Sequence, residues 1–310
     1  MGNNISIHIC TKDRHSELFV LLQSIRTQTI QNFNILILDD GSTTPVSNCY
    51  FIIYMINRLK YEGHDVKLIR NEKPSGVSNA RQKLVDYSLK NGKEKYFVRL
   101  DDDVIIEQDY LEKLLEVINS GYDIASGVTT PFVNPDFKRE IKFVKPIINR
   151  VHLDKDGNII MNMDDCGSNY MDEEILFAHH FRSCAMIKRE VFESGIDYKS
   201  RLSNDGFREE EILSFKAILK GFKLGVHTGA NARHLMTPSG GRRNDSTSNS
   251  MKFNQDIFEK TTKKMFEEHG DFIQNYNEKV LGYKLETPTE EQLNNQMNLV
   301  RFKRDRLMKD

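Results

Sequence analysis

The 310-residue sequence contains no tryptophan, no Cys-x-x-Cys pair and no apolar run close to the roughly 18 residues that a membrane-spanning helix requires. Its four cysteines lie far apart, a distribution typical of free thiols in a reducing compartment rather than of a zinc site. The N-terminus leads directly into an apolar segment, so we expect no signal peptide. These absences predict a cytoplasmic protein without a transmembrane segment.

The sequence also has no excess of either charge, since it contains 44 lysine and arginine residues and 45 aspartate and glutamate residues. Such a balance provides no overall basic field for nucleic acid, and we expect no nucleic-acid partner. It also provides no acidic excess of the kind that accompanies disorder. At 310 residues the chain can form one large domain, or one domain with an appendage.

Strand-like and helix-like segments alternate four times in the first half of the sequence. The predicted strands cover residues 5–10, 33–38, 66–69 and 96–100, and the predicted helices cover 16–26, 50–59, a segment beginning at 77, and 110–118. This alternation predicts an α/β fold, a mostly parallel sheet with helices on both faces.

Each of the four predicted strands ends in a polar cluster. The clusters are Thr11–Arg14, Asp39–Gly41, Asn71–Gly76 and Asp101–Asp103. Ligands of such sheets bind at the carboxyl ends of the strands, so we expect the clusters to converge on one site. A Gly-x-Gly-x-x-Gly fingerprint and a Walker A loop are both absent, which argues against dinucleotide binding.

The cluster Asp101–Asp103 places three adjacent carboxylates at the end of an apolar strand. Three such charges repel one another and resist desolvation. A divalent cation would offset the repulsion, and oxygen ligands suit Mg²⁺ or Mn²⁺. The alternative is a solvated acidic turn ahead of a helix.

The second half has a mixed pattern, which we interpret as an extension of the first sheet. Strands are expected at 123–128, 183–188, 222–226 and 232–236, helices at 189–194 and 209–220, and a hairpin within 143–163 around a turn at 154–157. Residues 1–236 would form one domain. Residues 237–250 would form a mobile lid or a plain linker, and residues 251–310 a helical extension. Its basic end predicts a solvated or docked helix; the alternative is peripheral contact with the cytoplasmic face of a membrane.

The motifs Ile5–Arg14, Ile37–Ser42, Gly76–Arg81 and Leu100–Asp103, in this order and spacing, resemble family 2 glycosyltransferases with the GT-A fold. The resemblance covers about residues 4–236, with 1–120 as the donor-binding half and 121–236 as the acceptor-binding half. It implies transfer of a sugar, with inversion, from a nucleotide-diphosphate sugar to an acceptor hydroxyl, with Mn²⁺ or Mg²⁺ as cofactor. A UDP-sugar is the favoured donor, and the acceptor would be a glycan, a lipid-linked molecule or a protein.

The resemblance also assigns roles to single residues. Nucleotide-sugar contacts fall on Thr11, Asp13, Arg14, Asp39, Asp40, Ser75, Gly76, Arg81, Asp101 and Asp102. Asp101 and Asp103 form the Asp-x-Asp motif, with Asp101 facing the ribose and Asp103 binding the metal. Asp102 takes the variable middle position, and its side chain is expected to point away. His234 matches a late histidine that supplies a further metal or phosphate contact.

Inversion in a single step requires a base that takes the proton of the acceptor hydroxyl. Among the acidic residues at the start of the predicted helix 209–220, the resemblance favours Glu210 as the base and Glu209 as a substrate contact. Glu211 stays open as an alternative, because the family has Asp where this sequence has Glu. Ordinary first-turn acids of a helix are the simpler interpretation.

Two further alternatives remain at this point. A retaining transferase resembling polypeptide N-acetylgalactosaminyltransferases would use the same segment, and a nucleotide-sugar or glycan-binding module would have lost the chemistry. The absence of tryptophan rules out the Gln-x-x-Arg-Trp motif of processive members. We therefore expect one or a few sugar additions.

Overall fold

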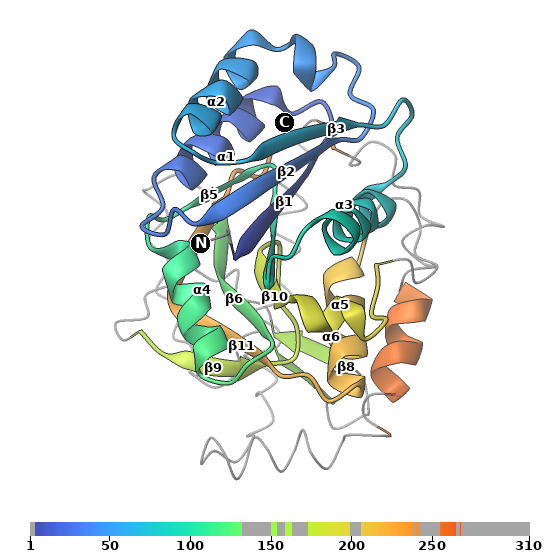
Figure 1. Cartoon of the computed structure of the whole chain (residues 1–310). Helices are drawn as coiled ribbons and strands as arrows, with labels where there is room; N and C mark the ends of the chain where they lie inside the picture. Colours follow the sequence, from blue (N-terminus) through green and yellow to red (C-terminus); the bar gives the residue numbers. More distant parts are fainter. Residues whose placement is uncertain are drawn as a thin grey trace.

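The computed structural model describes residues 4–131, 150–153, 159–162, 173–198, 206–237, 240–241, 255–264 and 267, and all structural statements concern these residues. The predicted turn at 154–157, most of the predicted loop 237–250 and residues 268–310 lie outside the described part of the chain. Figure 1 shows the arrangement of the elements.

The first half of the chain alternates strands and helices as the sequence predicts. In order, the elements are β1 (Ile5–Thr11), α1 (His15–Arg26), β2 (Phe33–Asp39), the 3-10 turn η1 (Val46–Asn48), α2 (Tyr50–Tyr61), β3 (Val66–Arg70), α3 (Val77–Asn91), β4 (Tyr96–Asp101), β5 (Val104–Ile106) and α4 (Tyr110–Asn119). The 3-10 turn and the three-residue strand β5 were not predicted.

The second half contributes the remaining elements. They are β6 (Ile124–Pro131), β7 (Arg150–Leu153), β8 (Ile159–Asn162), β9 (Ile175–Ala178), β10 (Ala185–Lys188), α5 (Arg189–Glu193), α6 (Glu209–Leu219) and β11 (Leu224–His234), followed by a helix over residues 255–264. The antiparallel pair β7–β8 lies within the predicted hairpin 143–163. The strand β9 was not predicted.

A nine-stranded sheet runs through both halves in the order β3-β2-β1-β4-β10-β6-β11-β5, and β9 pairs with β11. The strands β1 to β4 pair in parallel. The strand β10 then joins the two halves, because it lies antiparallel between β4 and β6. The second half therefore extends the first sheet, as expected, and makes it mixed.

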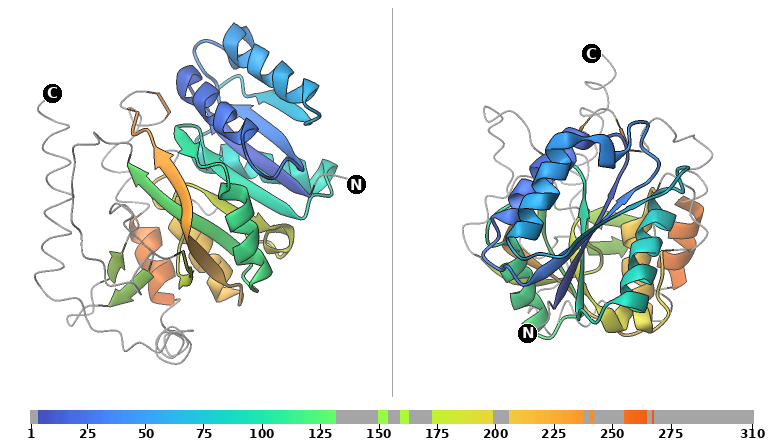
Figure 2. Two further views of the ribbon diagram at one scale, coloured as in Figure 1. Left: turned by 90° about the vertical axis from the view of Figure 1, so that its left-hand side faces the viewer. Right: turned by 45° about the horizontal axis from the view of Figure 1, so that its top comes forward.

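Helices cover both faces of the sheet, as Figures 1 and 2 show. On one face α1, α2 and α4 bury Leu18, Ile52 and Leu114 against the sheet in one large core. On the other face α5 and α6 contribute Val191 and Leu213 to a second core, and α3 packs against β1 and β2. Since both faces are covered, β1 is buried along nearly its whole length.

One prediction about the sheet is wrong in detail. The segments 222–226 and 232–236 were expected as two strands, but a single strand β11 covers Leu224–His234. Its register against β6 shifts between Val226 and Asn231. The strand continues through this interval, which contains Gly229, and the register shift accommodates the irregularity. In the described part of the chain, none of the helices combines the length and apolar character needed to cross a bilayer.

Candidate active site

The acidic triplet lies in a tight turn between two strands of the sheet. The strand β4 ends at Asp101, and β5 begins at Val104. The end of β11 lies beside this turn, because His234 pairs with Val104 in the ladder between β11 and β5. The backbone N–H of Leu235 also donates to the carbonyl oxygen of Asp103 at 2.8 Å. The sheet topology thus brings residues 103 and 234 together.

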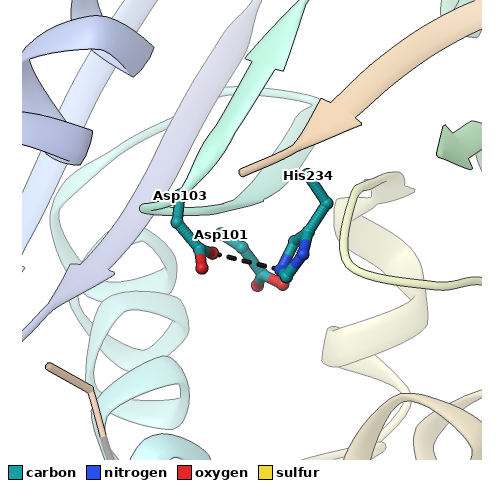
Figure 3. Close-up of side chains that lie close together, drawn as sticks. All are labelled: Asp101, Asp103 and His234. Carbon is teal, nitrogen blue, oxygen red and sulfur yellow. Dashed lines mark ion pairs between the residues drawn. The ribbon is translucent and has the colours of Figure 1, made fainter. Parts of the chain in front are cut away.

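Asp101, Asp103 and His234 form a cluster at this point, and Figure 3 shows their side chains facing one another. One ligand atom from each lies within 4.8 Å of the other two. His234 Nε2 is 3.2 Å from Asp103 Oδ1. Two carboxylates and one imidazole are a donor set that fits a divalent cation such as Mn²⁺. These residues are therefore the candidate metal ligands, as the sequence predicts.

Asp102 does not join this cluster, and its buried side chain pairs with Arg14. Arg14 Nη1 lies 2.9 Å from Asp102 Oδ1 and 3.1 Å from Asp103 Oδ2. Burial raises the pKa of Asp102 to about 6, with the charge of Asp103 in the same direction and Arg14 and Thr11 opposing it. Arg14 and Thr11, which were predicted as nucleotide-sugar contacts, are buried beside the acidic turn.

Asp101 has different neighbours. Burial alone would raise its pKa, but the guanidinium groups of Arg81 and Arg99 outweigh burial and hold the pKa well below its usual range. Arg81 makes an ion pair with Asp101 and lies 2.8 Å from Glu209 Oε1 through Nε. Arg81, predicted as a donor contact, therefore connects the acidic turn to the start of α6.

Two acidic residues at the start of α6 differ in exposure. Glu209 is buried with 3% of its surface exposed, whereas the Glu210 side chain is 22% exposed. Burial, and after it the charge of Glu209, raises the pKa of Glu210 to about 8. A carboxyl group with a pKa near neutrality can accept a proton during catalysis. Glu211 is buried and pairs with Arg208 at 3.2 Å.

Arg99 completes the site, and the sequence analysis did not identify it. Its Nη2 contacts Glu209 at 3.0 Å, Glu210 at 3.3 Å and Asp101 at 3.4 Å. An arginine within an otherwise apolar strand is the signal that could have identified it, since buried charges are rare unless paired. Two buried arginines thus join Asp101 to the start of α6, and Arg99 is the one of the two that contacts the candidate base Glu210.

The predicted nucleotide contacts at the ends of β2 and β3 make hydrogen bonds to neighbouring loops. Asp40 accepts bonds from Ser75 N and Oγ, both at 2.8 Å, from Gly76 N at 3.0 Å and from Asn71 Nδ2 at 2.7 Å. These bonds fix the loop that leads into α3.

Asp39 and Asp13 also accept hydrogen bonds from the backbone of neighbouring loops. Asp39 accepts from Ser42 N at 2.8 Å and from Val46 N at 3.0 Å, and it makes an ion pair with Arg70. Asp13 accepts from the backbone N–H of Thr43 at 2.6 Å. The carboxylates of Asp39 and Asp40 are buried and engaged in these bonds.

Comparison with known proteins agrees with this geometry. The model of glycosyl transferase family 2 matches residues 6–195, well over half of the chain. The chain belongs to this family. The matched range includes the acidic turn and the loop leading into α3, while α6 and His234 lie beyond it.

Two curated relatives come from the genus Rickettsia. An uncharacterized glycosyltransferase of Rickettsia conorii is 30% identical over 130 residues, and one of Rickettsia felis is 28% identical over 130 residues. Both alignments cover 42% of this chain but only 20% of the relative. The chain therefore aligns with about a fifth of the length of these proteins.

Solved structures show the same fold at low sequence identity. GalNAc-T7 with UDP, GalNAc and Mn²⁺ superposes with a TM-score of 0.53 at 15% identity, covering 75% of this chain and 44% of that one. TarS 1-349 of S. aureus in complex with UDP superposes with a TM-score of 0.51 at 15% identity, covering 77% and 61%. The chain has the GT-A fold of these glycosyltransferases.

Proposed function

We propose that this protein is a divalent-metal-dependent, inverting glycosyltransferase that moves a sugar from a UDP-sugar to an acceptor hydroxyl. The observation that carries this proposal is the convergence of the cluster Asp101–Asp103–His234 with a partly exposed carboxylate, Glu210, at one edge of the sheet. Membership of glycosyl transferase family 2 supports the reaction class. The structural neighbour that holds UDP, GalNAc and Mn²⁺ supports the donor and the metal.

In this proposal Asp101, Asp103 and His234 hold the cation, which when bound would act as a Lewis acid and stabilise the departing nucleoside diphosphate. Asp101 is suited to this role because Arg81 and Arg99 keep it ionised. Arg14 pairs with both Asp102 and Asp103 and so offsets part of the negative charge of the turn.

Glu210 would take the proton from the acceptor hydroxyl as this oxygen attacks the anomeric carbon. Its partly exposed carboxylate can reach a substrate, whereas Glu209 is buried and bonded to both arginines. Glu209 would then hold the arginines in place. The assignment of these two roles follows the register favoured by the sequence.

Thermal shift gives the first test. UDP-, GDP- and dTDP-sugars are each added with Mn²⁺, and a ligand that binds the folded state raises the melting temperature. We expect UDP-sugars to give the largest shift and EDTA to remove it. A shift of equal size in EDTA would contradict the metal-dependent part of the proposal.

Product analysis then tests the reaction. With the UDP-sugar identified in the screen, we expect release of UDP and, by NMR of the glycoside formed, an anomeric configuration opposite to that of the donor. Retention of configuration would favour the retaining transferase instead. Binding of UDP-sugar without any UDP release, across glycan, lipid-linked and protein acceptors, would favour a binding module.

A further inference from the structure

The buried side chain of Arg99 has contacts that point to a role in the reaction. Arg99 lies on β4 two residues before Asp101, so the two side chains leave the strand on the same face. Only 3% of its side chain is exposed, and its neighbours Val98 and Leu100 are fully buried apolar residues. A buried guanidinium is costly unless it is paired, so its partners indicate its role.

One nitrogen atom of Arg99 lies among three carboxylates from two elements. Its Nη2 is 3.0 Å from Glu209 Oε1, 3.3 Å from Glu210 Oε1 and 3.4 Å from Asp101 Oδ1. Asp101 comes from the end of β4, and the two glutamates come from the first turn of α6. Arg99 therefore connects the candidate metal site to the candidate base.

Contacts on the opposite side fix the orientation of this guanidinium. Its Nε donates to the carbonyl oxygen of Ser183 at 3.1 Å. Its central carbon lies 5.2 Å from the ring centre of Phe181 and 5.9 Å from that of Tyr198. A guanidinium held in this way offers its remaining donors in a fixed direction.

The charges in this cluster do not balance. Arg81 and Arg99 face three carboxylates, and Arg81 pairs with Asp101 and Glu209. In the described part of the chain, Arg99 is the one basic side chain that pairs with Glu210. Glu210 is thus the carboxylate with the least opposing positive charge, which agrees with its raised pKa.

We propose that Arg99 is a positioning residue that holds Glu210 in the orientation required to accept the acceptor's proton and couples it to the Asp101–Asp103 turn. The proposal rests on the proposed function, in which Glu210 is the base. Without Arg99 the Glu210 side chain would be free to rotate, and it would lose its opposing positive charge. The charges that would then face it are those of Glu209, Glu211 and Asp101, all negative.

The test uses the variants Arg99→Gln and Arg99→Lys, with UDP release from UDP-N-acetylgalactosamine, UDP-N-acetylglucosamine, UDP-galactose and UDP-glucose in Mn²⁺ as the measured reaction. Water serves as acceptor where none is known, since it must also lose a proton. We expect Arg99→Gln to lower kcat at least 30-fold and to move the limb on which the rate rises with pH up by at least one unit, because loss of the guanidinium charge makes Glu210 harder to ionise.

The conservative variant separates positioning from a general structural role. Arg99→Lys keeps a positive charge, so the pH limb should return to within about half a unit of that of the unaltered enzyme. Its kcat should recover only in part, because one ammonium group cannot reproduce the contacts of the guanidinium fork. If Arg99→Gln does not fold, Arg99→Lys is used for the test instead. All rates are measured 10 °C below the lowest melting temperature among the variants.

Arg189→Lys is the matched control. Arg189 donates to the carbonyl oxygens of Leu89 and Gly92 at 2.8 Å and 3.1 Å, away from the acidic turn. This variant should leave kcat and the pH limb unchanged.

A double variant distinguishes failure of this inference from failure of the proposed function. If Arg99 acts through Glu210, Arg99→Lys should change kcat less than twofold when Glu210→Gln is already present. A loss of equal size in both backgrounds, or an unchanged pH limb in Arg99→Gln, would overturn the role of Arg99 and leave the base assignment intact. If Glu210→Gln alone keeps its kcat, the base assignment itself fails, and this inference fails with it.

Discussion

Asp101 and Glu210 are carboxylates that contact the same nitrogen of Arg99, yet their surroundings move their pKa values in opposite directions. Asp101 is also paired with Arg81, and its pKa lies well below the usual range. Burial, and after it the negative charge of Glu209, raises the pKa of Glu210 to about 8. Carboxyl groups whose pKa values differ in this way are suited to different tasks. Asp101 is suited to remain an anion, and Glu210 to accept a proton.

The first prediction at this scale concerns the base. Glu210→Gln should lower kcat at least 100-fold and leave the affinity for UDP with Mn²⁺ within about threefold, because a base contributes to the chemical step. The profile of kcat/KM against pH should rise through a limb near 8, since the base must be deprotonated, and the limb should vanish in the variant. Calorimetry and rates of UDP release provide the two measurements.

Glu209→Gln tests whether Glu209, rather than Glu210, is the base. Glu209 bonds to both Arg81 and Arg99, so its loss should lower the melting temperature as well as the rate. If instead Glu209→Gln keeps stability and donor binding but loses transfer, and Glu210→Gln is active, the register is off by one residue.

The second prediction concerns the metal site. Asp103→Asn should abolish the Mn²⁺-dependent part of UDP binding, because it removes one of the charged oxygen ligands in the cluster with Asp101 and His234. Asp65→Asn, at an exposed position before β3, should bind as the unaltered protein does. Isothermal titration of UDP with and without Mn²⁺ measures the difference. Retention of Mn²⁺-dependent binding by Asp103→Asn would contradict the assignment.

Residues with charge in a recognisable pattern could be predicted from the sequence, whereas residues that act through three-dimensional contacts could not. Asp101, Asp103 and His234 were predicted as a metal site, and the structure brings them together. The hydrogen bonds of Asp40 depend on the path of a loop more than thirty positions away. Arg99 required knowledge that β4 and the start of α6 lie side by side.

Helices and strands also differ in how far the sequence predicts them. The strands β1, β2 and β4 are largely buried and appear as apolar runs followed by polar loops, and they were predicted together with the more exposed edge strand β3. The strand β5 has three residues, too few for a period to show. The strand β11 was predicted as two strands, and it is one because it pairs with β6 on both sides of the register shift between Val226 and Asn231.

The loop between β3 and α3 gives the prediction at the scale of elements. Asp40 is buried and accepts four hydrogen bonds from Asn71, Ser75 and Gly76. Asp40→Ala would leave these donors without their acceptor, and we expect a loss of about 2–4 kcal/mol in the free energy of unfolding. Urea denaturation measures the loss.

The same variant should also weaken UDP binding, because the loop carries Ser75 and Gly76, both predicted donor contacts. Asp65→Ala, a change of the same kind at an exposed position, should cost less than about 0.5 kcal/mol. Equal stability of the two variants would show that the bonds of Asp40 do not hold the loop.

For the molecule as a whole, the strands that carry the site are also those that join its two halves. The strand β4 pairs with β1 on one side and with β10 on the other. Beneath the site, this seam buries His8 of β1 together with Arg81 and Arg99, each with less than 8% of its surface exposed. Because these ionisable groups are buried, the free energy of unfolding should depend on their protonation.

His8 gives the prediction at this scale. Its Nε2 lies 2.8 Å from Ser88 Oγ and 3.1 Å from Ser6 Oγ. Burial, and after it the charge of Arg81, lowers the pKa of His8 from 6.5 to about 3. Between these two values the unfolded chain binds a proton that the folded protein does not, so stability falls as the pH falls.

From pH 7 to pH 4.5 this difference amounts to about 2–3 kcal/mol in the free energy of unfolding. His8→Gln keeps a polar group near Ser88 but cannot titrate, so its urea denaturation midpoints should depend less steeply on pH over this interval. His15→Gln, altered at the first residue of α1 where the ring bonds to the carbonyl oxygen of Thr44, should keep the slope of the unaltered protein. Identical slopes for the His8 variant and the unaltered protein would mean that the buried imidazole contributes nothing to acid unfolding.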